Sequence, residues 1–415
     1  MLASVLIAAC GGSSSSSDTT QLRLINATQT HASLTLLSNA SAAISGIPTD
    51  SSSAYAGVPS GSPALQLNDA TTSTVLATTA PSLAKDSHYA LLAYESGGVV
   101  RTSLISEDTT APAAGIAALR VFDTATDSGA IDVYVTDPSV DITTLSSPTF
   151  TFASSTQTQS GSYLTFAPGT FRIRVTGQGN TSDLRLDIPA VTLTSQQLAT
   201  VILTPTIGGT LINGGVLTQQ GTFTATRNTN ARVRLVADVG GGASVSATAG
   251  STTISSSVVS PAVGAYTLVP ASSVLAVKVN GATLAAPATQ PAAGSDTTLV
   301  VYGNSAASAV ASLISDDNHL PTVTTALKIR LFNGLSGSTT PLTLTADFAQ
   351  VAVNVQPGKA SPYSTITPSA SLRLEVMGNS GTVYMQSLTP PTNAVYTLFL
   401  LGDASAPVPL LRRDH

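Results

Sequence analysis

Five aspartates within 19 residues are the densest group of possible metal ligands: Asp123, Asp127, Asp132, Asp137 and Asp141. Carboxylates at the loop ends of a β-sandwich can bind Ca²⁺, which takes about six to eight oxygen ligands. The spacing does not follow the Asp-x-Asp-x-Asp-Gly calcium loop. Two interpretations stay open, namely weak calcium candidates at Asp123, Asp127 and Asp132, or solvated loop acids that keep the surface soluble.

Residue combinations that would support catalysis do not stand out. A serine nucleophile needs a base and an orienting group, but no Gly-x-Ser-x-Gly segment is present in the sequence. The four histidines are His31, His88, His319 and His415, and none recurs at an equivalent place in the repeats described below. We therefore predict that the chain is not an enzyme and has no catalytic residue, no resident metal and no cofactor.

Cys10 is the only cysteine, and it closes a short apolar run that ends Ile7-Ala8-Ala9. Small residues before a cysteine resemble the lipobox of bacterial lipoproteins, in which a signal peptidase cleaves and the thiol receives the lipid. Gly11, Gly12 and a run of serines follow as a flexible tether. The resemblance predicts lipidation at Cys10, and the alternative is an unmodified buried cysteine.

A signal peptide also needs a basic start and a longer apolar stretch. Nothing basic precedes Cys10, so we expect the true start to lie upstream and residues 1–19 to hold a truncated signal peptide, the lipobox and the tether. Gly11 after the cysteine favours the outer membrane, on its periplasmic or surface face. No other segment approaches the ~20 apolar residues of a spanning helix, so the predicted membrane attachment is the lipid.

The overall composition points away from several classes of protein. Only 9% of residues are charged, the formal net charge is −5 and tryptophan is absent. Without a basic surface, nucleic-acid binding is not expected. A hydrophobic content of 42% is sufficient for folded cores.

Four repeats run along the chain. A strand of apolar–Arg–apolar–apolar type recurs with its arginines 97, 114 and 96 residues apart, at Arg23, Arg120, Arg234 and Arg330. In each unit a tyrosine then precedes a proline by four or five residues, at Tyr55, Tyr163, Tyr266 and Tyr363. Recurrence in every copy indicates structural roles, with the arginines covering a strand face and the tyrosines packing.

A near-continuous apolar run closes each unit, and such runs are typical of central strands that are covered on both sides. The runs begin at Tyr89, Ala199, Leu299 and Tyr396. In addition, Ser103-Leu-Ile-Ser-Glu-Asp108 recurs 209 residues later as Ser312-Leu-Ile-Ser-Asp-Asp317. Units one and two together therefore resemble units three and four, which indicates duplication of a two-domain block.

The repeat length, the alternating strands and the lack of capped helical patterns predict an all-β chain of about four immunoglobulin-like antiparallel β-sandwich domains, each with about seven strands. The predicted domains are residues 20–112, 113–224, 225–322 and 323–415. Short linkers between them favour a rod-like string of domains.

The segment 118–135, which ends Asp132-Val-Tyr-Val135, resembles the opening of the bacterial domain-of-unknown-function 4397 (DUF4397) family. The later Pro168-Gly-Thr170 and the strand after it resemble a second part of that family, and the likeness is best over residues 118–205. It implies a secreted or lipid-anchored β-sandwich and carries no established activity.

These observations favour a lipid-anchored envelope protein that acts as a non-enzymatic spacer or adhesion rod, with a protein or glycan partner. The alternative is a carbohydrate- or calcium-binding module array at the cell surface. Because glycan grooves usually offer aromatic platforms and the chain has no tryptophan, the alternative is less favoured.

Overall fold

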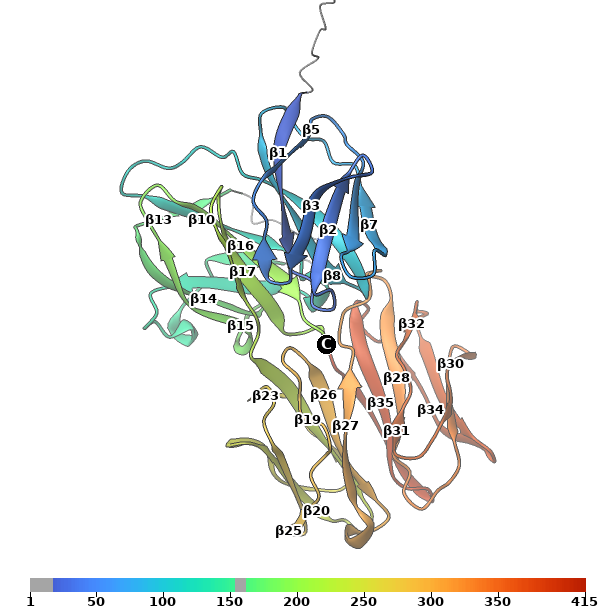
Figure 1. The fold of residues 1–415 in the computed structure, drawn as a ribbon. Helices are drawn as coiled ribbons and strands as arrows, with labels where there is room; N and C mark the ends of the chain where they lie inside the picture. The colour runs from blue at the N-terminus through green and yellow to red at the C-terminus, as the bar shows by residue number, and fades with distance from the viewer. Residues whose placement is uncertain (1–17, 154–161) are drawn as a thin grey trace, which may run out of the picture. The chain divides into compact units, whose positions relative to one another are not determined.

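A computed structural model describes residues 18–153 and 162–415. Within these ranges the chain is all-β and contains three short 3₁₀ turns and no α-helix: η1 (Thr126–Ser128), η2 (Ile142–Thr144) and η3 (Ala306–Ser308). Four two-sheet sandwiches follow one another along the chain, which confirms the predicted tandem array of immunoglobulin-like domains (Figure 1). Cys10 lies outside the described residues.

The first sandwich contains β1 (Thr19–Asn26), β2 (Ser33–Ser38), β3 (Ser41–Pro48), β4 (Ser51–Ser52), β5 (Ala56–Pro59), β6 (Leu65–Asp69), β7 (Val75–Thr79), β8 (His88–Ser96) and β9 (Val99–Ser106). One sheet has the order β4-β1-β8-β9, with β5 also paired to β1, and the other has the order β3-β2-β6-β7.

The second sandwich contains β10 (Ala117–Asp123), β11 (Ile131–Thr136), β12 (Phe150–Phe152), β13 (Leu164–Phe166), β14 (Gly169–Gly177), β15 (Asn180–Leu193), β16 (Leu198–Pro205), β17 (Ile212–Thr218) and β18 (Phe223–Thr226). Its sheets have the orders β13-β10-β16-β17-β18 and β12-β11-β14-β15.

The third sandwich contains β19 (Asn230–Val239), β20 (Ser244–Ala249), β21 (Thr252–Val259), β22 (Ala262–Val263), β23 (Thr267–Pro270), β24 (Leu275–Val279), β25 (Ala282–Leu284), β26 (Asp296–Gly303) and β27 (Val310–Asp316). Its sheets have the orders β22-β19-β26-β27, with β23 also paired to β19, and β21-β20-β24-β25.

The fourth sandwich contains β28 (Leu327–Asn333), β29 (Leu342–Ala346), β30 (Ala349–Val355), β31 (Lys359–Ala360), β32 (Ser364–Ile366), β33 (Leu372–Gly378), β34 (Gly381–Leu388), β35 (Ala394–Asp403) and β36 (Ala406–Arg413). Its sheets have the orders β31-β28-β35-β36, with β32 also paired to β28, and β30-β29-β33-β34.

The sheets depart from the predicted antiparallel pattern at one place in each sandwich. The first strand pairs in parallel with the strand of the apolar run, as in β1 with β8 and β19 with β26. Each sandwich also has nine described strands where the repeat length predicts about seven. In three sandwiches the edge strand is broken at the recurrent tyrosine into two short pieces, one on each side of it, and both pieces pair with the first strand.

The predicted central strands are confirmed: every residue of β16 is buried, as are the first eight residues of β35. Their inner faces join the sandwich cores, which are separate apolar clusters. In the third and fourth sandwiches the outer face is covered as well, because Val236 and Val300 of the third pack with Phe332, Phe399 and Leu401 of the fourth. The unbroken apolar runs therefore reflect two packed faces.

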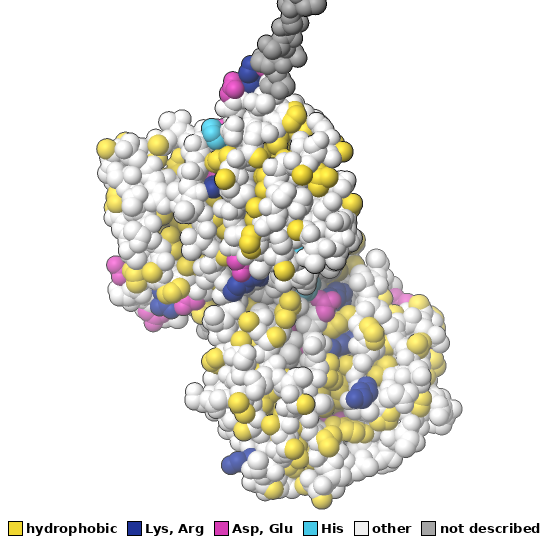
Figure 2. Space-filling view, viewed as in Figure 1, with side chains coloured by type: hydrophobic (Ala, Val, Ile, Leu, Met, Phe, Trp, Pro, Cys, Tyr) yellow, Lys and Arg dark blue, Asp and Glu magenta, His cyan; other side chains and the backbone are white. Residues whose placement is uncertain are grey.

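The chain divides into two compact units, of which one holds the first sandwich and the other holds the remaining three. The strands of the four sandwiches span residues 19–106, 117–226, 230–316 and 327–413. Thr19 and the end of β18 lie outside the predicted bounds of their domains, and the division into four domains at those bounds stays a prediction. On the face in Figure 2 charged side chains are sparse, in keeping with the 9% charge of the sequence.

Candidate functional site

The recurrent arginine and the recurrent tyrosine of each sandwich stack on one another. The guanidinium carbon lies over the tyrosine ring at 5.1 Å for Arg23–Tyr55, 4.8 Å for Arg120–Tyr163, 4.7 Å for Arg234–Tyr266 and 4.4 Å for Arg330–Tyr363. At these distances a cation and a ring attract each other, most strongly when both are desolvated. The two motifs therefore form one stacked pair in each sandwich.

The broken edge strand explains how the tyrosine reaches the arginine. Tyr266 lies between β22 and β23, and Tyr363 lies between β31 and β32. At this break the chain leaves the sheet edge for a few residues, so the ring can lie over the outer face of the first strand. There it covers the arginine, and Arg234 and Arg330 are both buried.

A hydroxyl and a carboxylate complete the cluster. In the last three sandwiches the parallel strand carries a threonine opposite the arginine, and its hydroxyl accepts a hydrogen bond from the arginine Nε. The distances are 3.1 Å for Arg120–Thr200, 2.8 Å for Arg234–Thr298 and 3.0 Å for Arg330–Thr397. In the first sandwich this position is Ala90, and Arg23 Nε donates to Glu107 at 2.8 Å instead. In three sandwiches the tyrosine hydroxyl donates to a carboxylate at the end of the last strand, as Tyr55 does to Glu107 at 2.6 Å. In the second sandwich the Tyr163 hydroxyl lies 3.4 Å from Thr200 Oγ1 instead.

The third and fourth sandwiches exchange their arginine partners. Arg234 of the third sandwich pairs with Asp414 of the fourth, and Arg330 of the fourth pairs with Asp316 of the third. All four side chains are buried. Because the equivalent residues swap across the contact, the two domains meet through the same face of each, as subunits do in a two-fold dimer.

Burial dominates the protonation of the stacked tyrosines. Desolvation, followed by the nearby Asp316 carboxylate, raises the pKa of Tyr266 well above its ordinary value. Desolvation likewise raises the pKa of Tyr363. Both hydroxyls therefore stay protonated and act as donors to carboxylates, which stabilises the buried negative charge.

The three calcium candidates are placed in separate hydrogen bonds. Asp123 Oδ1 accepts from the Ala125 N–H at 2.8 Å, and desolvation raises the pKa of Asp123 to about 7. Asp132 accepts from Thr151 Oγ1 and from the Gly179 N–H, both at 2.8 Å. Asp127 lies in η1, where desolvation also raises its pKa.

All three candidates are buried, so the interpretation as solvated loop acids is wrong for them. It fits Asp137 and Asp141, which are exposed and accept from the backbone two residues on. Within residues 18–153 and 162–415 no group of three or more His, Cys, Asp or Glu side chains is placed to hold a metal ion. The local aspartate turns could be foreseen from the sequence, whereas the burial depends on the sandwich.

Three histidines pair with carboxylates through Nδ1. His31 contacts Asp69 at 2.9 Å, His88 contacts Asp108 at 3.0 Å and His319 contacts Asp317 at 2.7 Å. The Nε2 of His319 lies 2.8 Å from the Thr206 carbonyl oxygen. The Nδ1 contact is thus local to the segment before the fourth sandwich, and the Nε2 contact joins that segment to the second sandwich.

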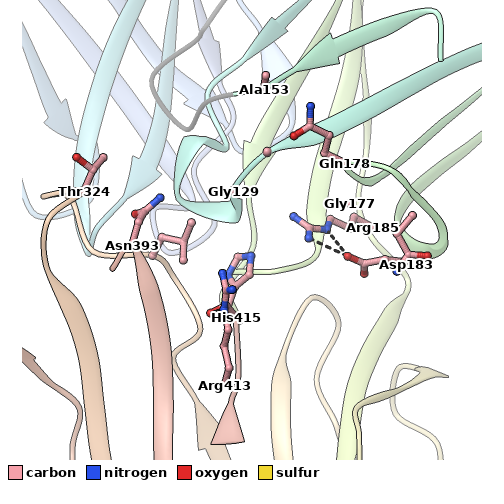
Figure 3. Close-up of a pocket in the computed structure, with 13 residues that line it drawn as sticks. Gly129, Ala153, Gly177, Gln178, Asp183, Arg185, Thr324, Asn393, Arg413 and His415 are labelled. Atoms are coloured by element: carbon pink, nitrogen blue, oxygen red, sulfur yellow. Dashed lines mark hydrogen bonds and ion pairs between the residues drawn. The ribbon is translucent and has the colours of Figure 1, made fainter. Parts of the chain in front are cut away.

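A polar cavity of about 570 Å³ lies where the second sandwich meets this segment and the fourth sandwich. Figure 3 shows Gln178 and Arg185 on one side of it and Asn393 and Thr324 on the other. Arg185 donates to Asp183 through Nε at 3.1 Å and through Nη2 at 2.8 Å, and its Nη1 donates to the Ser128 carbonyl oxygen. The Arg185 charge is therefore neutralised by the protein itself.

The remaining charge in the cavity wall is Arg413, at the end of β36. Its Nε donates to the main-chain oxygen of His415 at 3.0 Å, and the Arg413 side chain is exposed. His415 is partly buried, and desolvation, followed by the Arg185 charge, lowers its pKa to about 3. The His415 imidazole is then neutral at physiological pH.

Residues 20–134 match the family model described as "Domain of unknown function (DUF4397)". This segment is therefore similar to that family. The DUF4397 match covers the first sandwich and continues into β11, so it includes most of the segment 118–135 that carried the resemblance. It begins earlier than the sequence resemblance, which was best over residues 118–205.

No curated protein matches the chain. Among solved structures, a protein of Bacteroides uniformis described as a candidate cell adhesion protein has a TM-score of 0.23 and 14% identity, over 49% of this chain and 99% of that one. A similarly described protein of Bacteroides ovatus has a TM-score of 0.14 and 11% identity, over 72% and 97%.

The pneumococcal glycogen-degrading virulence factor SpuA has a TM-score of 0.17 and 9% identity, over 89% of this chain and 37% of that one. TM-scores of this size carry no argument about function.

Sequence reasoning missed the cavity. Its lining comes from segments as far apart as Gly129 and His415, and no local motif marks such a set. The sequence analysis also did not predict the exchange of arginine partners between the third and fourth sandwiches. The repeat at 209 residues did indicate that equivalent surfaces recur along the chain.

Proposed function

We propose that the chain is a lipid-anchored, non-enzymatic protein of the bacterial cell envelope that acts as a spacer or adhesion module. The observation that carries this proposal is the fourfold Arg–Tyr stack. Its polar residues recur in every sandwich and are occupied in holding strands together. Repeated domains whose recurrent residues are structural suit a protein that presents surfaces and loop tips.

One hairpin tip is suited to contact with a partner. Asp347 and Phe348 form the turn between β29 and β30, both with positive φ, and the Phe348 side chain is 77% exposed. A large aromatic at such a turn is unfavourable for the isolated fold. Exposed aromatic side chains are common anchors in protein interfaces, so this tip supports an adhesive role.

The lipid anchor is supported by Cys10 and by the Gly/Ser tether that precedes β1. In the described residues no helix is long and apolar enough to span a membrane. The test is metabolic labelling with a palmitate analogue in the native host, with the protein expressed from its own gene. We expect Cys10→Ala to abolish labelling and to release the protein from the membrane fraction.

A Ser15→Ala variant in the same tether is the matched control and should label like the unchanged protein. Equal labelling of the Cys10→Ala variant would overturn the lipid anchor. For the adhesive role, binding of the purified protein to whole cells and to envelope fractions should fall when Phe348 is replaced by glycine. Unchanged binding would remove this tip from the proposal.

A carbohydrate-binding module is the second candidate function, and the polar cavity beside the second sandwich favours it. A glycan array probed with the purified protein separates the two functions. A micromolar hit would favour the binding module over the spacer.

A further inference from the structure

We propose that Met385 is a site of reversible oxidation to methionine sulfoxide by peroxides, and that Arg373 both speeds this oxidation and holds its product. The proposal goes beyond the adhesive role and does not depend on it. It rests on two observations within the fourth sandwich, namely the exposure of Met385 and the position of the Arg373 guanidinium on its sulfur. Met377 of the same sheet provides an internal comparison.

Met385 is open to solvent. It lies on β34, an edge strand of the sheet β30-β29-β33-β34 (Figure 1), and it is 56% exposed. The chain has three methionines, of which Met1 lies outside the described residues and Met377 on β33 is partly buried. Because an oxidant in solution must reach the sulfur, Met385 is the described methionine that a peroxide meets first.

The Arg373 guanidinium lies on the Met385 sulfur. The register of β33 and β34 sets Met385 opposite Glu375, and Arg373 is two residues before Glu375 on the same face of the sheet. From this diagonal position the Arg373 Nε and Nη2 lie 3.3 and 3.1 Å from the Met385 Sδ. A thioether sulfur is a weak acceptor, so a sulfoxide oxygen at this place would be a better partner for the same two N–H groups.

The reaction transfers one oxygen atom from the peroxide to the sulfur. A lone pair of the Met385 sulfur attacks one oxygen of hydrogen peroxide, an S–O bond forms, and the O–O bond breaks with its electron pair going to the departing oxygen. The departing hydroxide takes the proton of the transferred oxygen, so the products are the sulfoxide and water. The sulfur loses two electrons and the peroxide gains them, so the peroxide is the complete oxidant.

Arg373 acts on this step through its charge. Negative charge develops on the departing oxygen as the O–O bond breaks, and a cation beside the sulfur stabilises that charge. The guanidinium does not give up its proton, so it supplies charge without acting as an acid. Glu375 Oε2 lies 2.7 Å from Arg373 Nη2 and offsets part of the charge, which makes the expected acceleration moderate.

The test is treatment of the folded full chain with hydrogen peroxide, followed over time by peptide mass spectrometry of the sulfoxides at Met385 and Met377. We expect Met385 to be oxidised first, and methionine sulfoxide reductase to reverse the product. Arg373→Gln should slow oxidation of Met385 by about threefold, the scale of a charge contact at an exposed site, and leave Met377 unchanged. Arg373→Lys keeps the charge and should restore part of the rate.

Two further variants separate the charge of Arg373 from its bulk. Glu375→Gln removes the carboxylate that offsets the charge and should speed oxidation of Met385. Arg412→Gln is the matched control, because Arg412 is an exposed arginine on β36 of the other sheet, and this variant should react like the unchanged protein.

Four outcomes would each overturn the proposal. They are faster oxidation of Met377 than of Met385, an equal or faster Met385 rate in Arg373→Gln, an unchanged or slower rate in Glu375→Gln, and equal slowing in Arg412→Gln. Melting temperatures of all variants show that the fold is retained. The sulfoxide is read directly, so the result is separate from the tests of the lipid anchor and of adhesion.

Discussion

Arg234 on the first strand of the third sandwich pairs with Asp414, which follows the last strand of the fourth. The two residues are 180 positions apart, and both are buried at the contact between the two domains. The reciprocal pair of Arg330 and Asp316 makes the same contact in the opposite sense. The outer faces of two duplicated domains are thus joined by swapping the partners that a single domain uses within itself, as Arg23 and Glu107 do.

The exchanged pair is expected to be essential for the packing of the two domains. Replacing Asp414 by alanine leaves Arg234 buried with only the longer contact to Asp316, whose Oδ2 lies 3.8 Å from Arg234 Nη2. Removing one member of a buried pair typically costs about 3–5 kcal/mol. We expect urea titration of Asp414→Ala to show that loss in the free energy of unfolding. Asp403→Ala, which removes an exposed carboxylate, is the control and should change it by less than about 1 kcal/mol. A similar change in both variants would show that the exchange does not stabilise the contact.

The tyrosine hydroxyls should differ in their contributions to stability. Tyr266 donates to Asp316 at 2.6 Å, whereas the Tyr163 hydroxyl lies 3.4 Å from Thr200 Oγ1. Tyr266→Phe keeps the ring over the arginine and loses a hydrogen bond to a charged group, at about 1.5–3 kcal/mol. Tyr163→Phe should cost less than about 1 kcal/mol by thermal unfolding. A larger loss of stability for Tyr163→Phe than for Tyr266→Phe would contradict the role assigned to the hydrogen bond from Tyr266 to Asp316.

The Asp238 carboxyl predicts a pH dependence of stability. It is 1% exposed, its Oδ2 has no hydrogen-bond partner, and desolvation raises its pKa to about 7. A carboxyl with a folded-state pKa above its unfolded value stabilises the fold fully below about pH 4, and this contribution is lost as the pH rises through 7. The advantage of Asp238→Asn over the unchanged protein should therefore grow by up to about 4 kcal/mol between pH 4 and pH 8.

Urea titrations at the two pH values measure the Asp238 effect. The control is Asp137→Asn, because Asp137 is exposed and hydrogen bonds from Ser139 lower its pKa. The stability of Asp137→Asn relative to the unchanged protein should fall as the pH rises, because a carboxyl with a lowered pKa stabilises the fold at high pH. A flat difference between Asp238→Asn and the unchanged protein would rule out titration of this group.

The Phe348 turn should become more stable when the side chain is removed. Both central residues of the turn have positive φ, and glycine adopts that conformation without steric cost. Phe348→Gly is expected to raise the free energy of unfolding by about 1 kcal/mol, as measured by thermal denaturation. Val353→Gly, at another exposed apolar position within β30, should lower it by about the same amount. A destabilised Phe348→Gly variant would show that the ring is held by the fold, for example through its contact with Arg373.

The sequence by itself determined the class of the fold and its repetition. Alternating residues in segments such as Leu372–Val376 specify a strand with one face in the core, because side chains alternate sides along a strand. The recurrence of Arg23, Arg120, Arg234 and Arg330 revealed four copies and marked these residues as structural, since the same position rarely serves a specific ligand four times.

The tertiary structure decided what each recurrent residue contacts. Whether Arg234 meets the acid of its own domain or Asp414 of the next depends on which outer faces pack together, and strand periodicity carries no information about that. The same holds for the buried aspartates Asp123 and Asp132, whose exposure depends on the strands around them. It holds also for the cavity beside Arg413, because its walls come from segments that only folding brings together.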